Sequence, residues 1–450
     1  MFRNISLLYS VLLLSFAILE QVQAQGPLTP PGAPGPTMKS LDQVEPRTDV
    51  ASLPPSSISK HAITQPGSYY LTGDLVAAAG QGAISIDSSL VTLDLNGYTI
   101  SSAGNNGIGV AIAIFTTGQE NITIKNGHIA GGGTRSGSSV TGGGFLSGID
   151  IVAVVPNLDP TNILVDQINA SGFELDGIDV ESASPSSLVT NCIVKTVGQT
   201  GISAGEVRDC VAQDCGSDGI AAFGNVVNCR GKSFGSLVST MGIRAGANVT
   251  NSTGIVDNLG EHGINAGANV SNSFGISSRG HGIYAEGNVE NSTGKSTGTN
   301  GAGSSDGVHS LRTVRGSDGE ASTGNGVFGT RVVDCTGSGS GSGNGINATG
   351  TISGCRGIAN GSGNGINSTT SVSDSYGSSS SGIGIRCTTV QNSFASTSTG
   401  AQGLFAFGTA ANCRGDHGNS GIAIQATIAS ACTAVGGKTI TATTKVDGTP

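Results

Sequence analysis

The stretch Gly263-Ile-Asn-Ala-Gly-Ala-Asn-Val-Ser-Asn-Ser273 returns nineteen residues later as Gly282-Ile-Tyr-Ala-Glu-Gly-Asn-Val-Glu-Asn-Ser292. A glycine followed by Ile, Val or Leu recurs through the rest of the chain at steps of 18 to 25 residues. These glycines are Gly177, Gly201, Gly219, Gly242, Gly263, Gly282, Gly307, Gly326, Gly345, Gly365, Gly384, Gly403 and Gly421. Self-similarity at a fixed period of this length predicts a solenoid.

A second column runs in phase with the glycines and holds either Cys or Ser. Its members are Cys192, Cys210, Cys229, Ser252, Ser273, Ser292, Ser317, Cys335, Cys355, Ser375, Ser393, Cys413 and Cys432. A buried Cys behaves as a small hydrophobic residue, so we interpret the column as inward packing. Stacked cysteines one coil apart also fall within the Cα range of a disulfide, and the sequence leaves that alternative open. Cys215 and Cys387 lie outside the column.

The repeats predict an all-β fold. Each period holds two or three short β-prone pieces separated by Gly, Asn and Ser, and 74 glycines with only 11% charged residues disfavour helices. Each period is then one coil of a single-stranded parallel β-helix, with about sixteen coils in all. Variable step lengths and the usual crossover of parallel strands favour the right-handed form.

The ends of the chain differ from the repeats. Residues 1–24 contain a basic residue, an apolar run and a small-residue cleavage site, which predicts a signal peptide and a secreted product. Residues 25–66 are expected to form a Pro-rich tether and a short cap, with a helix over residues 38–44. The β-helix is assigned to 67–435 and a polar C-terminal tail to 436–450, within which Thr-Ile-Thr-Ala-Thr suits an edge strand.

Charge and hydropathy argue against two classes of partner. The net charge of -9 comes from scattered residues and no basic stripe occurs, so nucleic acid is not expected. No segment after the leader approaches the roughly 20 apolar residues of a spanning helix, so no transmembrane segment is expected.

Four segments resemble a known group, the secreted right-handed parallel β-helix repeat proteins of bacteria, which are relatives of the pectate lyase superfamily. They are Leu28–Thr48, Gln65–Leu75, Val91–Gly97 and Asn121–Gly127. The resemblance implies the fold for nearly the whole mature chain and polysaccharide as the first substrate to consider. It does not fix an activity, because one fold serves many functions.

The resemblance also supplies catalytic elements to look for. Gly280-His281-Gly282 matches the Gly-His-Gly element of the polygalacturonase-like hydrolases, and Leu175-Asp176-Gly177-Ile178-Asp179 looks like part of their Asn-Thr-Asp-Gly element. Those enzymes place the two elements on neighbouring coils, whereas Asp176 and His281 are five repeats apart here. No complete catalytic motif is found, so the sequence leaves open whether the protein is an enzyme, either a polysaccharide lyase or a glycoside hydrolase.

One group of functional residues is predicted to converge. His262, His281 and Asp306 each precede a Gly-Ile or Gly-Val pair and should stack on successive coils. The candidate binding patch is Arg244, His262, Asn265, His281, Tyr284, Asp306 and His309. Such a patch suits a sugar or an acidic polymer. The alternative is that Asp, Asn and His occupy this column because they bond local backbone.

The stacked histidines beside Asp306 could also bind a metal, although their spacing matches no recognised metal motif. Six to eight oxygens for calcium are not assembled, so no cofactor is expected and calcium is left as an unsupported alternative. Two functions stay open. The first is a secreted β-helix that binds or processes extracellular polysaccharide, and the second is a non-enzymatic structural or surface-adhesion rod, favoured by the Asn- and Ser-rich half from Gly319 onward.

Overall fold

The computed structural model describes residues 47–446, apart from 106–108, 116–117, 153–159, 182–185, 236–238, 259, 299–304 and 420. The predicted signal peptide, the Pro-rich tether and the helix over 38–44 lie outside the described residues. The chain divides into the units Met1–Arg47 and Thr48–Pro450, and the second contains every described strand.

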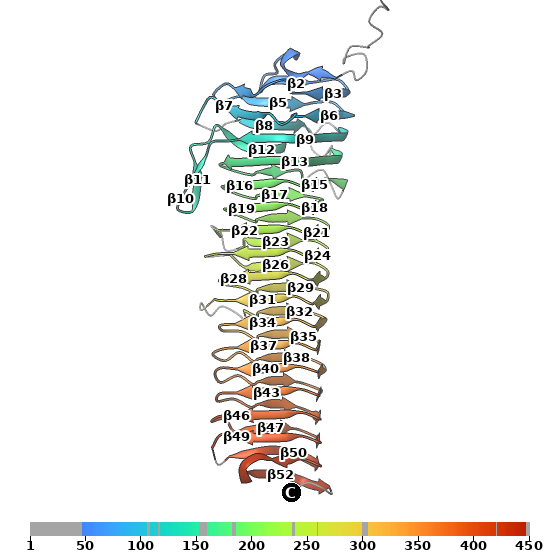
Figure 1. Ribbon diagram of the computed structural model, residues 1–450, viewed down its shortest axis with the longest axis vertical. Coiled ribbons are helices and arrows are strands. Elements are labelled where there is room, and N and C mark those ends of the chain that lie inside the picture. The colour runs from blue at the N-terminus through green and yellow to red at the C-terminus, as the bar shows by residue number, and fades with distance from the viewer. Residues whose placement is uncertain are drawn as a thin grey trace, which may run out of the picture. The chain divides into compact units, whose positions relative to one another are not determined.

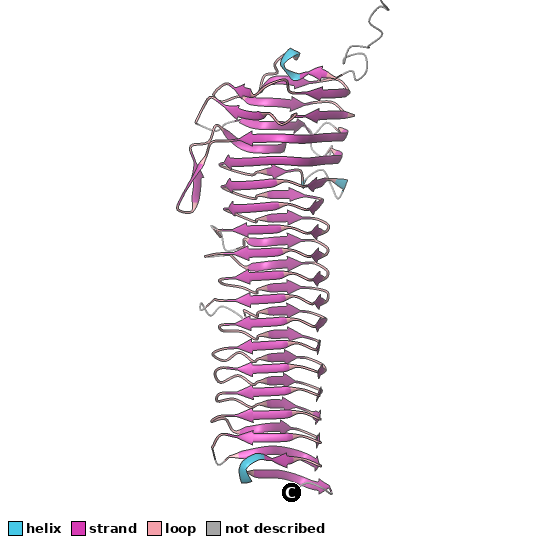
Figure 2. Ribbon diagram, viewed as in Figure 1, coloured by secondary structure: helices cyan, strands magenta, loops and turns pink. Residues whose placement is uncertain are grey.

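The unit from Thr48 onward is a stack of parallel coils in which each coil contributes one strand to each of three ladders (Figures 1 and 2). The repeated stretch forms β26 (His262–Ala266), β27 (Val270–Ser271) and β28 (Phe274–Ser277), and then β29 (Ile283–Ala285), β30 (Val289–Glu290) and β31 (Thr293–Ser296). Each strand of the first set pairs in parallel with its counterpart in the second. The predicted fold class, an all-β parallel solenoid, is confirmed. Right-handed winding stays a prediction of the crossover rule.

The first ladder positions the candidate patch. From its fourth strand onward it runs through β12 (Phe145–Val152), β14 (Ile178–Asp179), β17 (Ile202–Ala204), β20 (Ile220–Ala222), β23 (Met241–Ala245), β26, β29, β32 (Val308–Ser310), β35 (Val327–Gly329), β38 (Ile346–Ala348), β41 (Ile366–Ser368), β44 (Ile385–Cys387), β47 (Gln402–Ala406) and β50 (Ile422–Ser430). Because all pairs are parallel and in register, one sequence position becomes one column of side chains along the stack.

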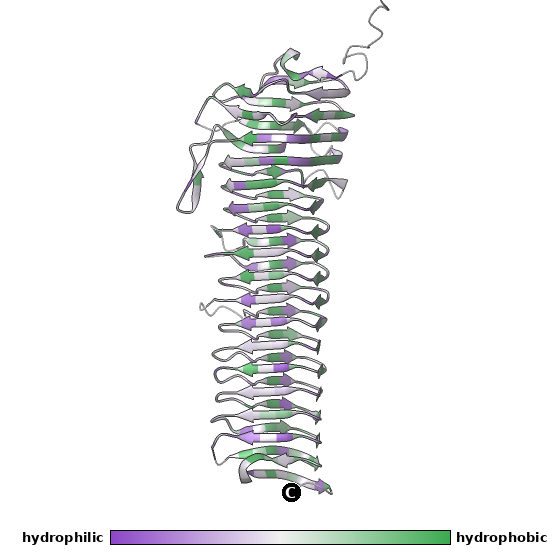
Figure 3. Cartoon of the chain, viewed as in Figure 1, coloured by the Kyte–Doolittle hydropathy of each residue, from purple (hydrophilic) through white to green (hydrophobic). Residues whose placement is uncertain are grey.

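The core is built from such columns. Ile243, Ile264, Ile283 and Val308 are register partners on successive coils, and each is fully buried. Figure 3 shows hydrophobic positions recurring at corresponding places in successive coils. A single coil has no second layer to cover these side chains, so each coil depends on its neighbours for burial.

The glycine before each core Ile or Val is crowded by atoms of another strand of its own coil and of the next coil. A Cβ on Gly263 would lie 2.4 Å from the amide nitrogen of Ile276 and 2.6 Å from the carbonyl oxygen of Gly282. Only a residue without a Cβ fits there, which explains the recurrence. The prediction is wrong for the last member of the glycine column. Leu404 pairs with Ile424, so the residue aligned with Gly403 is Ala423 and not Gly421.

The side chains of the Cys and Ser column face inward, as interpreted. The residue directly before each column member has a left-handed backbone conformation (positive φ) and forms a turn. Asn251, before Ser252, has φ 50°, and its side-chain amide donates to Asn228 Oδ1 of the previous coil at 3.2 Å. All nine cysteines are free and buried. Cys215 aligns with Val197 and Ser233, and Cys387 aligns with Ala406, so both fill small inward positions of other columns.

The predicted coil number is too low, because the solenoid has about 19 turns. Most coils outside the regular repeats lie at the N-terminal end, where β9 (Glu120–Ala130) and β13 (Thr161–Phe173) are long strands that each take part in two ladders. These coils carry inserted segments and lack the regular Gly-Ile and Cys/Ser period from which coils were counted.

Strands continue into both terminal ranges. One lies in the range expected for the tether and cap, and the other is the edge strand predicted at Thr-Ile-Thr-Ala-Thr. β2 (Ser59–Ile63) lies within the range expected for the tether and cap, and it pairs with β5 (Gly82–Ile86). β52 (Thr439–Val446) lies within the expected C-terminal tail and pairs with β50. In the described part of the chain, no helix has the length and apolarity to cross a membrane.

Candidate functional site

An outward row of side chains runs along the first ladder, one position after each core residue. Arg244, Asn265, Tyr284 and His309 are register partners on β23, β26, β29 and β32. Phe328 on β35 continues the row after His309. The four predicted members of the row therefore lie side by side on successive coils, as expected.

The column before each Gly-Ile or Gly-Val pair bonds the backbone of the next coil. His262 Nδ1 accepts from the amide of His281 at 3.2 Å, and His281 Nδ1 accepts from the amide of Asp306 at 2.9 Å. Asp306 Oδ1 in turn accepts from the amide of Asn325 at 2.7 Å. We call this the acceptor column, and its bonding members are Asp176, Asp218, His262, His281, Asp306, Asn325, Asn344 and Asn364. The backbone-bonding alternative therefore describes what these side chains do.

This bonding also determines what each histidine presents to solvent. Because Nδ1 of His262 and of His281 accepts a backbone N–H, the proton of each neutral ring is on Nε2. Burial lowers the pKa of His262 to about 4 and that of His281 to about 3, so both rings are neutral at pH 7. Each ring therefore offers an Nε2–H donor without a positive charge.

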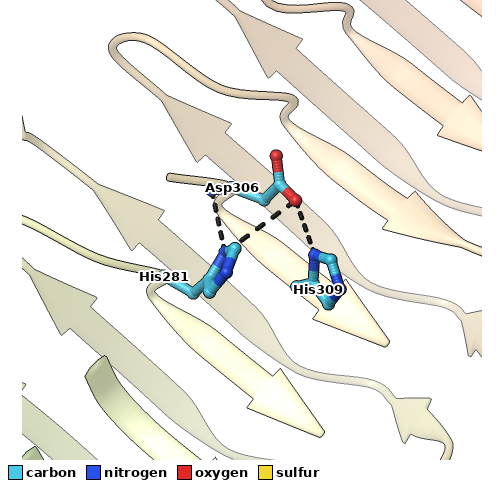
Figure 4. A group of neighbouring side chains, drawn as sticks. All are labelled: His281, Asp306 and His309. Atoms are coloured by element: carbon cyan, nitrogen blue, oxygen red, sulfur yellow. Dashed lines mark hydrogen bonds and ion pairs between the residues drawn. The ribbon is translucent and has the colours of Figure 1, made fainter. Parts of the chain in front are cut away.

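His309 is held differently, by a buried carboxylate (Figure 4). Its Nδ1 lies 2.7 Å from Oδ2 of Asp306, whose side chain is fully buried, and the ring itself is 15% exposed. With Nδ1 donating to the carboxylate, Nε2 carries the lone pair and can accept a hydrogen bond. Asp306 thus fixes the tautomer and the orientation of His309.

Five rings from both columns pack together across four coils. The ring centroids of His262 and His281 are 5.1 Å apart, those of Tyr284 and His309 5.3 Å, and those of His309 and Phe328 4.5 Å. Such packing holds the rings in place. We call Arg244, His262, Asn265, His281, Tyr284, Asp306, His309 and Phe328 the polar strip.

Arg244 is paired within the same face. Its guanidinium lies 2.7 Å from Oδ2 of Asp218, a carboxylate whose side chain is 3% exposed, whereas the arginine side chain is 52% exposed. Burial raises the pKa of Asp218, and the charge of Arg244 opposes that rise. The pair holds the guanidinium at the N-terminal end of the polar strip.

Four residues of this face were not part of the candidate binding patch predicted from the sequence: Phe328, Asp150, Asp179 and Glu181. Phe328 follows Gly326-Val327 as Tyr284 follows Gly282-Ile283, so the pattern contained the signal. Further toward the N-terminus, Asp150 and Asp179 are register partners at the same outward position, and Ser203 Oγ donates to Glu181. Burial raises the pKa of Asp150 to about 6, and it raises that of Asp179 as well. Glu181 lies outside the repeat pattern.

The hydrolase-like elements stay separated. Asp176 belongs to the coil of β14 and His281 to the coil of β29, and β17, β20, β23 and β26 lie between them in the ladder. At about 4.8 Å per coil, the two residues cannot act on one bond. Burial raises the pKa of Asp176 to about 7, and its Oδ1 accepts from the amide of Thr200, so it serves the acceptor column.

His281, Asp306 and His309 are also the residues that suit a metal ion best among the described ones. Each offers a ligand atom, and these atoms lie within 4.8 Å of one another. Imidazole and carboxylate groups are zinc ligands. However, Nδ1 of His281 already accepts the amide of Asp306, and Nδ1 of His309 is bonded to the Asp306 carboxylate. An ion held by these atoms would have to displace both hydrogen bonds.

No family model and no curated protein matches the chain. Two solved structures align along most of it. The A-module of the Azotobacter vinelandii mannuronan C-5 epimerase AlgE6 shares 10% identity at a TM-score of 0.28, covering 85% of this chain and 90% of that one. The catalytic domain of a GH87 α-1,3-glucanase in complex with nigerose shares 13% identity at a TM-score of 0.14, covering 86% of this chain and 64% of that one. Both scores are too low to bear on activity.

Fold and site together therefore define the protein as a parallel β-solenoid with one face rich in hydrogen-bonding side chains. Its function has to be argued from this face.

Proposed function

We propose that the protein is secreted and binds an extracellular polysaccharide along the polar strip. The observation that carries this proposal is the unbroken series Arg244, Asn265, Tyr284 and His309, which places one hydrogen-bonding side chain at the same outward position on four successive coils. Nε2 of His262 and of His281 adds further donors beside the row.

A polysaccharide matches this arrangement better than a small molecule does. A chain of hydroxyl groups needs donors and acceptors repeated along a line, and the strip supplies guanidinium, amide, phenol and imidazole groups in that order. The rings are fixed by stacking and by the Asp306 carboxylate, so little side-chain entropy is lost on binding. The apolar surfaces of the aromatic rings add to the contact area.

The test is retention on insoluble polysaccharides. A panel of cellulose, xylan, mannan, chitin, α-1,3-glucan and pectin is incubated with the purified protein, and bound and free fractions are quantified. The double variant Tyr284→Ala/His309→Ala should reduce retention at least about tenfold, the effect of losing about 1.4 kcal/mol of binding free energy.

A matched control lies on another face. Tyr376 and Phe394 are also neighbouring outward aromatics, with ring centroids 5.4 Å apart, but they belong to the third ladder. The variant Tyr376→Ala/Phe394→Ala should keep wild-type retention. Equal losses in the two double variants, or none in either, would contradict binding at the polar strip.

A structural rod is the second candidate. Asn325, Asn344 and Asn364 in the C-terminal half use their side-chain oxygens on the backbone of the next coil, so this part of the column serves the stack itself. Absence of retention on every polysaccharide, together with no release of reducing ends or unsaturated products, would favour the rod.

A further inference from the structure

The charges of the polar strip are already matched within the protein. Arg244 is paired with the buried carboxylate of Asp218, and His309 is bonded to the buried carboxylate of Asp306, each at 2.7 Å. Any positive charge on either side chain is thus offset by an anion directly behind it. A ligand anion on the strip would be attracted by the arginine or histidine and repelled by the buried carboxylate behind it, so the net attraction would be small.

The other two histidines add no positive charge. His262 and His281 use Nδ1 as a backbone acceptor, and desolvation keeps both rings neutral well below pH 7. They can donate to a hydroxyl or a carbonyl oxygen, but they do not form ion pairs with a carboxylate or a sulfate. Asn265 and Tyr284 between them are neutral as well.

Toward the N-terminus the same face becomes acidic. Beyond Arg244 the row passes through the buried Ala221 and Ser203 and then reaches Asp179 and Asp150, three and four coils from Arg244. Asp176 lies in the acceptor column of the same coil as Asp179, and Glu181 accepts from Ser203 Oγ. Their mutual repulsion contributes to the raised pKa of Asp176, after burial as the main cause. Two arginines, Arg312 and Arg331, occur near the other end, but they line a separate depression together with Glu286.

From this charge distribution we propose that the polar strip selects an uncharged polysaccharide and rejects uronic-acid or sulfated polymers. The inference rests on the proposed function and specifies its ligand. A neutral glycan exchanges water hydrogen bonds for those of Asn265, Tyr284 and the histidines without an electrostatic penalty. A polyanion long enough to extend from the strip past Ala221 and Ser203 meets Asp179 and Asp150, whose ionised carboxylates have the same charge sign, and such juxtaposition is costly across an interface.

The test compares polysaccharides that share a backbone and differ in charge. Hydroxyethyl cellulose is paired with carboxymethyl cellulose, and fully methyl-esterified polygalacturonan with its de-esterified form, in affinity gels at pH 7. A gel containing the neutral member of at least one pair should retard the protein. The apparent affinity for that neutral polymer should be at least about tenfold higher than for its charged counterpart. Retardation should stay constant between about 50 and 500 mM NaCl, since it involves no ion pairing.

Two variants separate this inference from the proposed function. Asp179→Asn should strengthen binding of the charged member several-fold and leave the neutral member unchanged. Stronger wild-type binding of the charged member that falls with salt and is lost in Tyr284→Ala/His309→Ala would overturn the inference while keeping the strip as a binding site. Absence of retardation by all four polymers, and on the insoluble panel, would overturn both.

Discussion

In the acceptor column, a histidine can take part in two kinds of hydrogen bond, one to the neighbouring backbone and one to a ligand, because its ring has two nitrogen atoms. Asn325, Asn344 and Asn364 each accept one backbone amide of the following coil. His262 and His281 accept the corresponding amide through Nδ1, and their second ring nitrogen, Nε2, keeps its proton for another partner. The structural and the binding interpretation of His281 are therefore compatible, because different atoms of one ring serve them.

Replacing His281 tests this division of roles. His281→Asn retains an acceptor for the buried amide of Asp306 and should unfold at nearly the wild-type denaturant concentration. His281→Ala leaves that amide without a partner and should lose about 1–3 kcal/mol of unfolding free energy. Urea titrations of the three proteins measure both values, and equal destabilisation by Asn and Ala would contradict the acceptor role.

The buried histidines also predict a pH dependence. The folded pKa of His281, about 3, lies below the usual value of about 6.5, so between these limits the unfolded chain binds more protons. The contribution of the neutral ring is complete above about pH 6.5 and falls as the pH decreases, by at most about 1.4 kcal/mol per unit. The stability difference between wild type and His281→Asn, measured at pH 7 and pH 4.5, should shift against the wild type at pH 4.5.

The comparison with His281→Asn is needed because carboxyls act in the opposite direction. Burial raises the folded pKa of Asp150 and of Asp176, so these groups favour folding at acidic pH and oppose it as the pH rises toward 7. They are present in both proteins, so their contribution cancels in the difference. A difference that does not change between pH 7 and pH 4.5 would contradict the depressed pKa of His281.

At the scale of the element, each coil depends on two backbone features, a crowded glycine corner and a left-handed turn. The turn residue is Asn or Asp in most coils and glycine in two of them, Gly316 and Gly354, which have φ 56° and 66°. The turn before Cys432 has Ala431 at φ 50°. Short polar residues and glycine are the ones that tolerate this conformation.

The left-handed turn gives a prediction at Asn251, which has φ 50°. Asn251→Gly keeps the conformation and loses the bond to Asn228, so it should cost under about 1 kcal/mol. Asn251→Val places a β-branched side chain at positive φ and should cost about 1–3 kcal/mol. Thermal unfolding followed by circular dichroism would rank the two variants, and a more stable valine variant would contradict the assignment of the turn.

The sequence predicted the repeating coils well because their geometry excludes most residues at two positions. Gly263 has no room for a Cβ, and Ser273 fills a narrow inward site, so the same residue types recur visibly. The long strands β9 and β13 have crowded or left-handed positions too, at Gly127 and Asn162, but these do not recur at the spacing of the regular coils, so they gave no period to count. The repeat period alone placed Tyr284 beside His309. The sequence could not predict which ring nitrogen of each histidine carries the proton, because that depends on hydrogen bonds to neighbouring residues in the folded stack.

For the whole molecule, burial by stacking makes all interior groups inaccessible together. The nine cysteines are between 0% and 4% exposed and occur from Cys192 to Cys432. The native protein should therefore react with a thiol reagent such as dithionitrobenzoate far more slowly than the unfolded chain, in which all nine should titrate. Rapid reaction of several thiols in the native protein would indicate that coils separate locally.

In-register columns also make the coils modular. Val327, Ile346 and Ile366 follow one another in the ladder as equivalents, so the segment between Gly345 and Gly365 could be excised or duplicated and the new neighbours would still match, hydrophobe to hydrophobe and asparagine to asparagine. Relatives of this chain can therefore differ in length by whole coils while keeping the polar strip intact, which makes the length of the molecule a property that evolution can adjust independently of its binding surface.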